Sequence, residues 1–218
     1  MIKTFIFATT AIALCLLLGI PEARAQSTEV SKFEVGADFT SITFSSGQSK
    51  PGLGSRLTYN LNKHLALEAA GYFFPGRCDF CGGEVTGRIV EGLFGVKAGK
   101  RFNKWGVFAK ARPGLIRFGK GAFDIVPSGT ATVFPFTFIN RSLTHAALDL
   151  GGVVEFYPSK HLVVRFDGGD TIIHHQRRTF NGLFPDPGNP TGAILLPVTS
   201  PAFTRHTFQF MGGVGFRF

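Results

Sequence analysis

The chain has 218 residues, enough for one domain, and a formal net charge of +9. Charged residues make up only 17% of it, below the ~25% of a typical soluble domain, while Phe and Gly reach 25 and 28 residues. This composition excludes disordered, collagen-like and coiled-coil proteins. Past residue 25 no run of ~20 apolar residues occurs, which excludes a bundle of membrane-spanning helices.

The first 25 residues are predicted to be a signal peptide. A basic start at Met1-Ile2-Lys3 precedes a mostly apolar stretch from Phe5 to Ile20, and Ala23-Arg24-Ala25 has the small-residue pattern of a cleavage site. A membrane anchor is the alternative, but the apolar stretch is short for a span. We expect cleavage after Ala25, which leaves residues 26–218 as one exported domain.

From Phe33 onward, apolar and polar residues alternate with the period of two that is typical of β-strands. Their lengths of 9–14 residues suit strands that cross a membrane at a tilt. The eight predicted strands are 32–43, 52–60, 64–74, 86–99, 105–117, 145–157, 161–170 and 206–218.

The connections between these strands alternate in length. Those at 61–63, 100–104 and 158–160 are short, whereas the other four are longer, and the last two run to about 30 residues. Short turns at one end and long loops at the other are the layout of a membrane barrel, with both termini beside the short turns. We therefore predict an all-β fold, a closed eight-stranded antiparallel up-and-down transmembrane β-barrel. The short turns repeat Lys-His-Leu at 63–65 and 160–162, which we interpret as shared hairpin chemistry.

Alternation alone does not say which face points outward, so a soluble barrel with an apolar interior is an alternative. One face carries seven acids and six bases, fewer charges than a solvated surface normally has, and near-equal numbers allow pairing inside a narrow lumen. The other face is mostly Phe, Leu, Val, Ala and Gly, which suits lipid. The predicted lumen charge network is Glu34, Asp38, Arg56, Glu68, Glu91, Lys97, Lys110, Arg112, Asp149, Glu155, Arg165, Asp167 and Arg217.

Two groups of residues concern the membrane boundaries. Arg88 and Arg117 break the apolar pattern near the long-loop ends of their strands, where the cost of a lipid-facing charge fades. Aromatic residues near strand ends predict interfacial girdles, with Tyr59, Trp105, Phe156, Tyr157 and Phe216 at the short-turn end and Phe73, Phe74 and Phe208 at the other.

Cys78 and Cys81 are the two cysteines of the expected mature chain. Because an exported protein meets an oxidising compartment, we predict a disulfide between them. The C-x-x-C spacing also occurs in redox proteins and in half of a zinc site. However, Pro75-Gly76 and Gly82-Gly83 predict a loop here, whereas redox chemistry needs a helix N-terminus.

Few residues suggest catalysis or metal binding. His174 and His175 have only Asp170 nearby as a further ligand, so we expect a solvated loop and no metal or other cofactor. Ser142 with His145 is the pair that a lipid-modifying enzyme would use, but no orienting group accompanies it, so we expect no enzyme. A small pore, with Glu68, Glu91, Arg112 and Arg165 setting selectivity, is the alternative, although eight strands leave little lumen.

The long loops are the best candidates for interaction. Residues 122–139 include the apolar run Val133 to Phe138, and residues 179–204 include Phe180, Phe184 and Ile194-Leu195-Leu196. Such segments pack on each other or contact an extracellular ligand. We expect a monomer with a structural or surface-interaction role, such as envelope integrity or adhesion.

The positive charge has two possible partners. The basic short turns, with Lys63, Lys100, Arg101, Lys104 and Lys160, suit anionic lipid headgroups. Nucleic acid is not expected, because the bases are scattered and the chain carries an export signal.

The signal peptide, the hairpin from Gly52 to Asn60 with Leu65 to Glu68 after it, and the last strand from Phe208 to Phe218 resemble the eight-stranded outer-membrane β-barrel family, which includes the OmpA-like membrane domain. The resemblance implies a place in the bacterial outer membrane for residues 26–218, in contact with its lipids. It also implies that Phe210, Phe216 and Phe218 form the signal that the barrel-assembly machinery reads.

Overall fold

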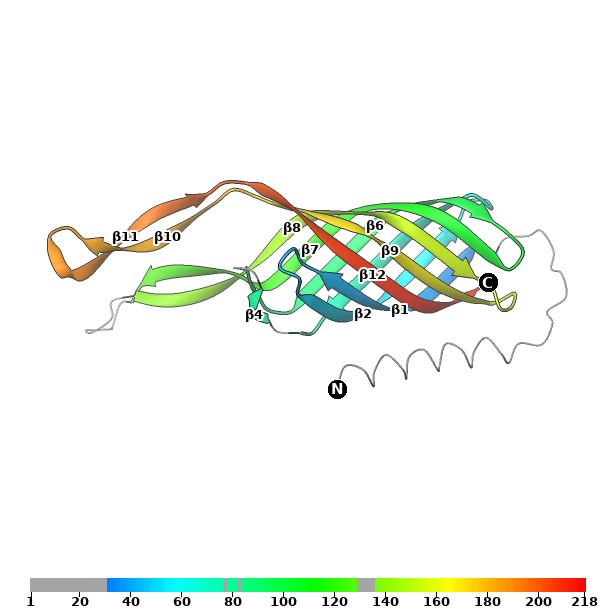
Figure 1. The fold of residues 1–218 in the computed structure, drawn as a ribbon, viewed down its shortest axis with the longest axis horizontal. Helices are drawn as coiled ribbons and strands as arrows, with labels where there is room; N and C mark the ends of the chain where they lie inside the picture. The colour runs from blue at the N-terminus through cyan, green and yellow to red at the C-terminus, as the bar shows by residue number, and fades with distance from the viewer. Residues whose placement is uncertain (1–30, 77, 82–83, 129–135) are drawn as a thin grey trace.

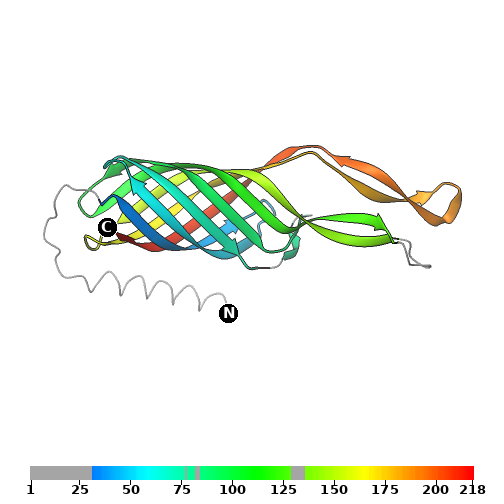
Figure 2. The same cartoon turned by 180° about the vertical axis from the view of Figure 1, so that it is seen from behind.

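The structure is a computed structural model that describes residues 31–76, 78–81, 84–128 and 136–218. The predicted signal peptide and the segment Val133 to Pro135 lie outside the described residues. Eight strands form one closed antiparallel barrel, in which β1 pairs with β12 (Figure 1, Figure 2). They are β1 (Phe33–Thr43), β2 (Ser49–Asn60), β3 (Leu65–Phe74), β6 (Ile89–Arg101), β7 (Trp105–Pro127), β8 (Phe136–Phe156), β9 (Leu162–His175) and β12 (Phe203–Arg217). The predicted fold class is confirmed.

The strand registers set the tilt of the barrel. Stepping from each residue to its partner on the next strand leads once around the barrel and back to β8. A path that starts at Val154 returns at Thr144, ten residues away. It passes through Phe166, Gly212, Phe39, Leu53, Phe73, Val90 and Arg117. With ordinary strand spacings, a stagger of ten over eight strands tilts each strand by about 40° from the barrel axis. Such a barrel is wide enough for interlocking side chains and little else.

Burial alternates residue by residue around the wall, as in β1, where positions 34, 36, 38 and 40 are buried and 33, 35, 37 and 39 are exposed. The inward positions carry the ionisable side chains. The outward positions form an apolar belt of exposed side chains that includes Val35, Phe39, Leu53, Leu57, Phe94, Val107, Leu115, Val154, Phe166, Phe210 and Val214. Among the described residues, no helix is long and apolar enough to cross a membrane.

The repeated Lys-His-Leu turns have the same geometry. His64 places its Nδ1 2.9 Å from the Gly99 carbonyl on the next strand, and Gly99 returns its N–H to the His64 carbonyl. His161 does the same with Arg217, with 3.0 Å from Nδ1 to the carbonyl oxygen. Each histidine therefore ties a short turn to its neighbouring strand.

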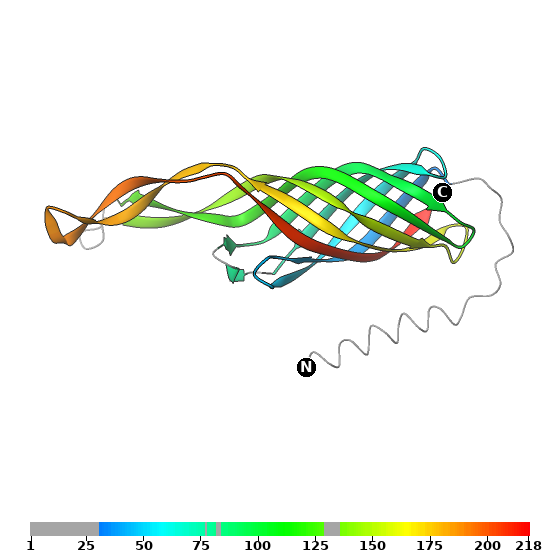
Figure 3. The ribbon, with the colours of Figure 1, turned by 45° about the horizontal axis from the view of Figure 1, so that its top comes forward.

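The long connections, which were expected to be loops, consist largely of paired strands. β7 and β8 stay paired beyond the barrel, out to Pro127 and Phe136, and a second ribbon consists of β10 (Arg178–Asp186) and β11 (Asn189–Ser200). Figure 3 shows both ribbons projecting from the end opposite to the C-terminus. A small hairpin, β4 (Cys78–Cys81) with β5 (Glu84–Thr86), joins β3 to β6. Backbone pairing replaces irregular structure because the ribbons leave fewer polar groups unsatisfied.

The prediction of aromatic residues in interfacial girdles is wrong at two positions. Phe74 and Tyr157 point inward and are buried, because each has the inward parity of its strand, set by Glu68 and Glu155 respectively. The outward aromatic residues Phe33, Trp105, Phe216 and Phe218 remain exposed beside the short turns.

Candidate functional site

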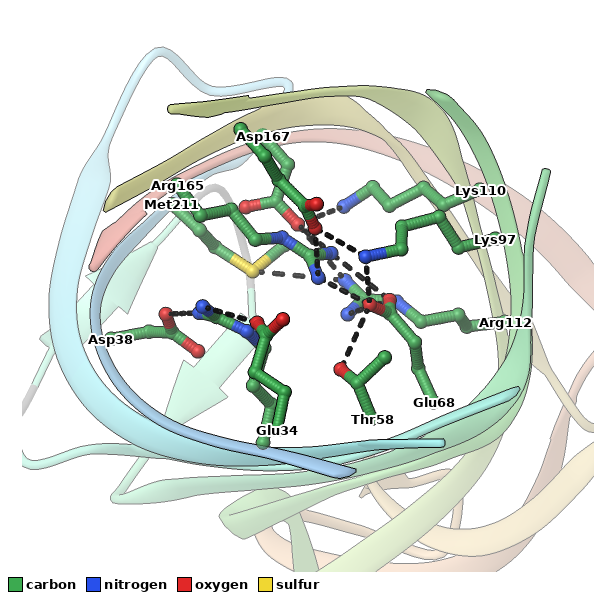
Figure 4. Close-up of polar contacts among 12 residues, drawn as sticks. Glu34, Asp38, Thr58, Glu68, Lys97, Lys110, Arg112, Arg165, Asp167 and Met211 are labelled. Atoms are coloured by element: carbon green, nitrogen blue, oxygen red, sulfur yellow. Dashed lines mark hydrogen bonds and ion pairs between the residues drawn. The ribbon is translucent and has the colours of Figure 1, made fainter. Parts of the chain in front are cut away.

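All thirteen ionisable residues of the predicted lumen network lie inside the barrel, and none is more than 8% exposed. Figure 4 shows part of this set reaching into the lumen from strands around the wall, with labels on Glu34, Asp38, Glu68, Lys97, Lys110, Arg112, Arg165 and Asp167. A buried charge is costly unless it is paired and hydrogen-bonded, so the contacts within this set decide its stability.

Arg165 on β9 and Glu68 on β3 form the central contact. Arg165 donates from Nη2 to Glu68 Oε2 over 2.9 Å, and from Nη1 to Oε1. β9 and β3 are four strands apart in either direction around the closed order, so this pair spans the lumen. Lys97 joins the same centre through Glu68 and Glu155.

Two further groups surround the centre. Arg112 donates from Nε to Asp149 Oδ2 over 2.8 Å, and Lys110 lies 2.9 Å from the same oxygen. Arg56 pairs with Glu34 and Asp38 on the neighbouring strand β1. These contacts connect β1, β2, β3, β6, β7, β8 and β9, so the network braces most of the wall.

Glu91 and Arg217 are the exceptions within the predicted set. Among the described residues no base lies within ion-pair distance of Glu91, whose Oε2 accepts a 2.9 Å hydrogen bond from Gln209. Arg217 instead donates to the Ser159 carbonyl over 3.0 Å and lies over the Tyr157 ring. Both are held by neutral groups and not by opposite charges.

An apolar plug borders the network at Met211, whose Sδ lies 3.7 Å from Arg112 Nη2, and extends toward the end that carries the ribbons. β7 and β9 both run from the short turns toward the ribbons. Ile116 and Phe118 follow Arg112 on β7, and Ile173 follows Asp167 on β9, so these apolar residues lie nearer to the ribbons than the charged ones. The plug consists of Ile42, Phe44, Ala70, Tyr72, Phe74, Ile89, Leu93, Ile116, Phe118, Ala147, Ile173 and Met211. Charged and apolar side chains thus fill successive levels of the lumen, which leaves little room for an aqueous path.

The candidate catalytic and metal residues do not come together. Ser142 points outward and accepts a 2.8 Å hydrogen bond from Arg117, whereas His145, three residues on, points inward against the Phe118 and His175 rings. His174 and His175 likewise point to opposite faces, and His174 lies 3.2 Å from the Thr204 hydroxyl. The expected His174-His175 loop is instead the end of β9. No group of three or more potential metal ligands occurs among the described residues.

Sequence reasoning missed an outward polar pair between β9 and β12. His206 Nδ1 lies 2.5 Å from Asp170 Oδ2, and both side chains are exposed. The alternation of faces along each strand could have revealed this pair, because Asp170 and His206 are polar residues at positions of the otherwise apolar outward face.

The β10–β11 ribbon carries an apolar face beyond the barrel. Register places Phe180 opposite Val198, Gly182 opposite Leu196 and Phe184 opposite Ile194. A side chain on Gly182 would collide with Phe184 and Val198, which shows that these two side chains close over that glycine. We call Phe180, Phe184, Ile194, Leu196 and Val198 the ribbon face.

The two ribbons touch near their bases. Asn181 donates from Nδ2 to the Ile125 carbonyl of β7 over 3.1 Å. This contact agrees with loops that pack on each other, but Phe184, Leu196 and Phe138 remain at least 40% exposed. Mutual packing therefore covers only part of the apolar surface.

The side chains of Cys78 and Cys81 lie outside the described residues, so the disulfide remains a prediction. The backbone places both cysteines in β4. Mass measurement of the purified mature chain, alkylated before and after reduction, is expected to find both thiols blocked until reduction. Two free thiols before reduction would contradict the disulfide.

Phe210 and Phe216 of the predicted assembly signal lie on the outward face of β12, and Phe218, the residue after this strand, is also exposed. Phe218 also closes the barrel, since its N–H and carbonyl pair with those of Phe33 over 3.0 and 3.1 Å. The two rings stack with centroids 6.2 Å apart.

No protein-family model matches the sequence, and no curated protein matches it. Among solved structures, the chain is similar to Neisserial surface protein A (16% identity, TM-score 0.48, 86% of this chain and 98% of that one). It is also similar to the outer membrane protein OprG of Pseudomonas aeruginosa (10% identity, TM-score 0.48, 89% and 99%). A third is Ail, the attachment invasion locus protein of Yersinia pestis, solved with the heparin analogue sucrose octasulfate (12% identity, TM-score 0.44, 86% and 97%).

The closed barrel and the apolar belt define an integral outer-membrane protein. A closed barrel satisfies every backbone polar group in lipid, and the outward side chains of the belt are those that hydrocarbon accepts. The predicted location in the bacterial outer membrane is therefore confirmed. From the usual layout of such barrels, we expect the short turns to face the periplasm and the ribbons to face outward.

Proposed function

We propose that this protein is a non-enzymatic surface-binding protein that holds the β10–β11 ribbon outside the cell for contact with an extracellular protein. The observation that carries the proposal is the ribbon face, an apolar surface on two strands in which Phe184 and Leu196 remain 40% and 44% exposed. Exposed apolar patches on otherwise polar surfaces are typical of protein interaction sites. The barrel then serves as a rigid membrane anchor.

Several features support this assignment. The ribbon face contains two Phe side chains, and aromatic residues are enriched in the centres of protein interfaces. Arg178 at the base of the ribbon lies 5.7 Å from the Phe180 ring, so a cation borders the apolar surface. Prolines at 185 and 197 lie in the ribbon strands, and they remove backbone donors that would otherwise invite strand addition. Contact through the face is thus favoured over contact through an edge.

The remaining parts of the proposal concern assembly. We infer a monomer, because closure of the barrel leaves it no strand edge for pairing. We infer that the barrel-assembly machinery inserts the chain, and that no nucleic acid is bound. The filled lumen favours this function over a pore, and the separation of Ser142 from His145 disfavours the lipid-modifying enzyme.

The test uses bacteria that display the full chain. Adherence is measured on wells coated with fibronectin, laminin or collagen, together with aggregation of the cells themselves. The variant Phe184→Ser/Leu196→Ser is expected to lower adherence about tenfold, because a desolvated aromatic anchor typically supplies about 1–2 kcal/mol or more. The control Thr179→Ala/Thr199→Ala alters the opposite ribbon face and is expected to adhere like the parent chain.

A second variant replaces residues 179–199 with a short Gly-Ser turn and keeps the barrel strands. If cells displaying it adhere and aggregate like cells with the parent chain on every surface, the ribbon is not a binding element. Surface display is checked for each variant by antibody labelling of intact cells, so that loss of protein is not mistaken for loss of binding.

A further inference from the structure

We propose that Arg88 and Arg117 form a binding site for the phosphate groups of an outer-leaflet lipid on the outer wall of the barrel. These two residues are called the basic patch. The proposal concerns the barrel wall and does not depend on the ribbon face.

The strand registers bring the two residues together. Arg117 on β7 lies opposite Val90 on β6, and Gly119 donates its N–H over 2.8 Å to the carbonyl of Arg88, which directly precedes β6. Arg88 and Arg117 are therefore diagonal neighbours on the outer face, a separation that long side chains bridge. Both residues are exposed.

The basic patch has an unbalanced charge. Arg117 donates to the Ser142 hydroxyl, and the nearby Arg141 is already paired with Asp124 at 3.1 Å. Among the side chains that the structure describes, no carboxylate lies within ion-pair distance of Arg88 or Arg117. Like charges on neighbouring strands repel each other, and an anion between them removes that repulsion.

The depth of the basic patch fits a lipid phosphate. Immediately toward the membrane, the outward side chains of the same strands are Val90 and Leu115, which are 50% and 58% exposed and belong to the apolar belt. The basic patch therefore lies where hydrocarbon gives way to headgroups. A guanidinium donates two parallel hydrogen bonds to a phosphate, and Ser142 adds a hydroxyl beside it.

The outward polar groups at the corresponding end of β9 and β12 have partners of their own, in the Asp170–His206 pair and the His174–Thr204 contact. Arg141 on β8 is likewise paired with Asp124. Arg88 and Arg117 are instead two adjacent outward cations without a carboxylate partner among the described side chains, which indicates a discrete site.

The experiment measures binding of bis-phosphorylated lipid A to the folded mature chain in neutral detergent, by titration and by native mass spectrometry. The variant Arg88→Gln/Arg117→Gln is expected to weaken binding about tenfold or more, because it removes the charged donors to phosphate. The control Lys104→Gln/Lys160→Gln removes the same charge from the periplasmic turns and is expected to bind like the parent chain. Heat-modified mobility on gels verifies that each variant is folded.

Two further arms identify the source of the phosphate. Dephosphorylated lipid A is expected to bind the parent chain as weakly as bis-phosphorylated lipid A binds the patch variant. A large excess of inorganic phosphate is expected to leave the bound lipid in place. Equal affinities of the parent chain and the patch variant, an equal loss in the control, or displacement by free phosphate would each overturn the proposal.

Discussion

Arg165 on β9 and Glu68 on β3 join diametrically opposite walls of the barrel, with 2.9 Å between Nη2 and Oε2. Glu68 also lies within 3.6 Å of Lys97 and Arg112. Three bases thus share one carboxylate, and the geometry predicts a large difference between Glu68 and Glu91, which has no base within ion-pair distance among the described residues.

Replacement of Glu68 with Gln is expected to lower the free energy of unfolding by about 3–5 kcal/mol, because it leaves buried bases uncompensated. The matched change Glu91→Gln removes a carboxylate that has a neutral partner, so it is expected to be neutral or stabilising. Urea unfolding in lipid vesicles, followed by Trp105 fluorescence, measures both. Equal destabilisation by the two variants would contradict the assignment of Glu68 as the centre of the network.

Inward glycines make room for the large inward side chains, which predicts opposite effects for two Gly→Ala variants. A Cβ at Gly54 would meet the Tyr72 ring and the Gly71 carbonyl, so Gly54→Ala is expected to destabilise the barrel by about 1–3 kcal/mol. Gly92 points outward, and a Cβ added there would have no neighbour within 4 Å, so Gly92→Ala is expected to stabilise by about 0.5–1 kcal/mol. The same vesicle assay distinguishes them, and destabilisation by Gly92→Ala would refute the prediction.

The lumen is expected to be closed to ions at two levels. In planar bilayers the parent chain is predicted to give no steady conductance. Glu68→Ala/Arg165→Ala is also predicted to stay silent, because the apolar plug remains. Adding Phe74→Ala and Phe118→Ala to that variant is expected to produce measurable openings. A steady conductance of the unmodified chain would instead support a pore.

Phe218 is expected to matter for assembly in cells more than for folding. Phe218→Ala should reduce the amount of protein in the outer membrane several-fold, while refolding into detergent changes little. Phe166→Ala, which removes a similarly exposed ring from β9, serves as the control. The comparison uses fractionated membranes and heat-modified mobility, and equal losses for both variants would contradict a special role of Phe218 in assembly.

The alternation of side chains between the two faces of a strand explains why the inward and outward residues could be predicted from the sequence. Because side chains alternate between faces, one correct assignment on a strand places all the others, and all thirteen ionisable residues lie inside. The same alternation also shows why Phe74 and Tyr157 are inside and why Ser142 and His145, three residues apart, cannot meet.

The ribbons were not predictable from alternation. Ile194-Leu195-Leu196 is a continuous apolar run, and prolines at 185, 187, 190 and 197 are typical of loops. Their pairing satisfies backbone groups outside the membrane, where no buried face imposes a period of two. Cross-lumen contacts such as Arg165 with Glu68 also depend on the stagger of the barrel, which no single strand encodes.

The network and the plug both lie below the point where the ribbons leave the wall. Cohesion of the membrane-embedded portion is therefore independent of what the outer hairpins contain. Foreign peptides grafted between β10 and β11 would be held on a paired ribbon above a barrel that is stable without them. This makes the fold a practical carrier for presenting epitopes on living bacteria.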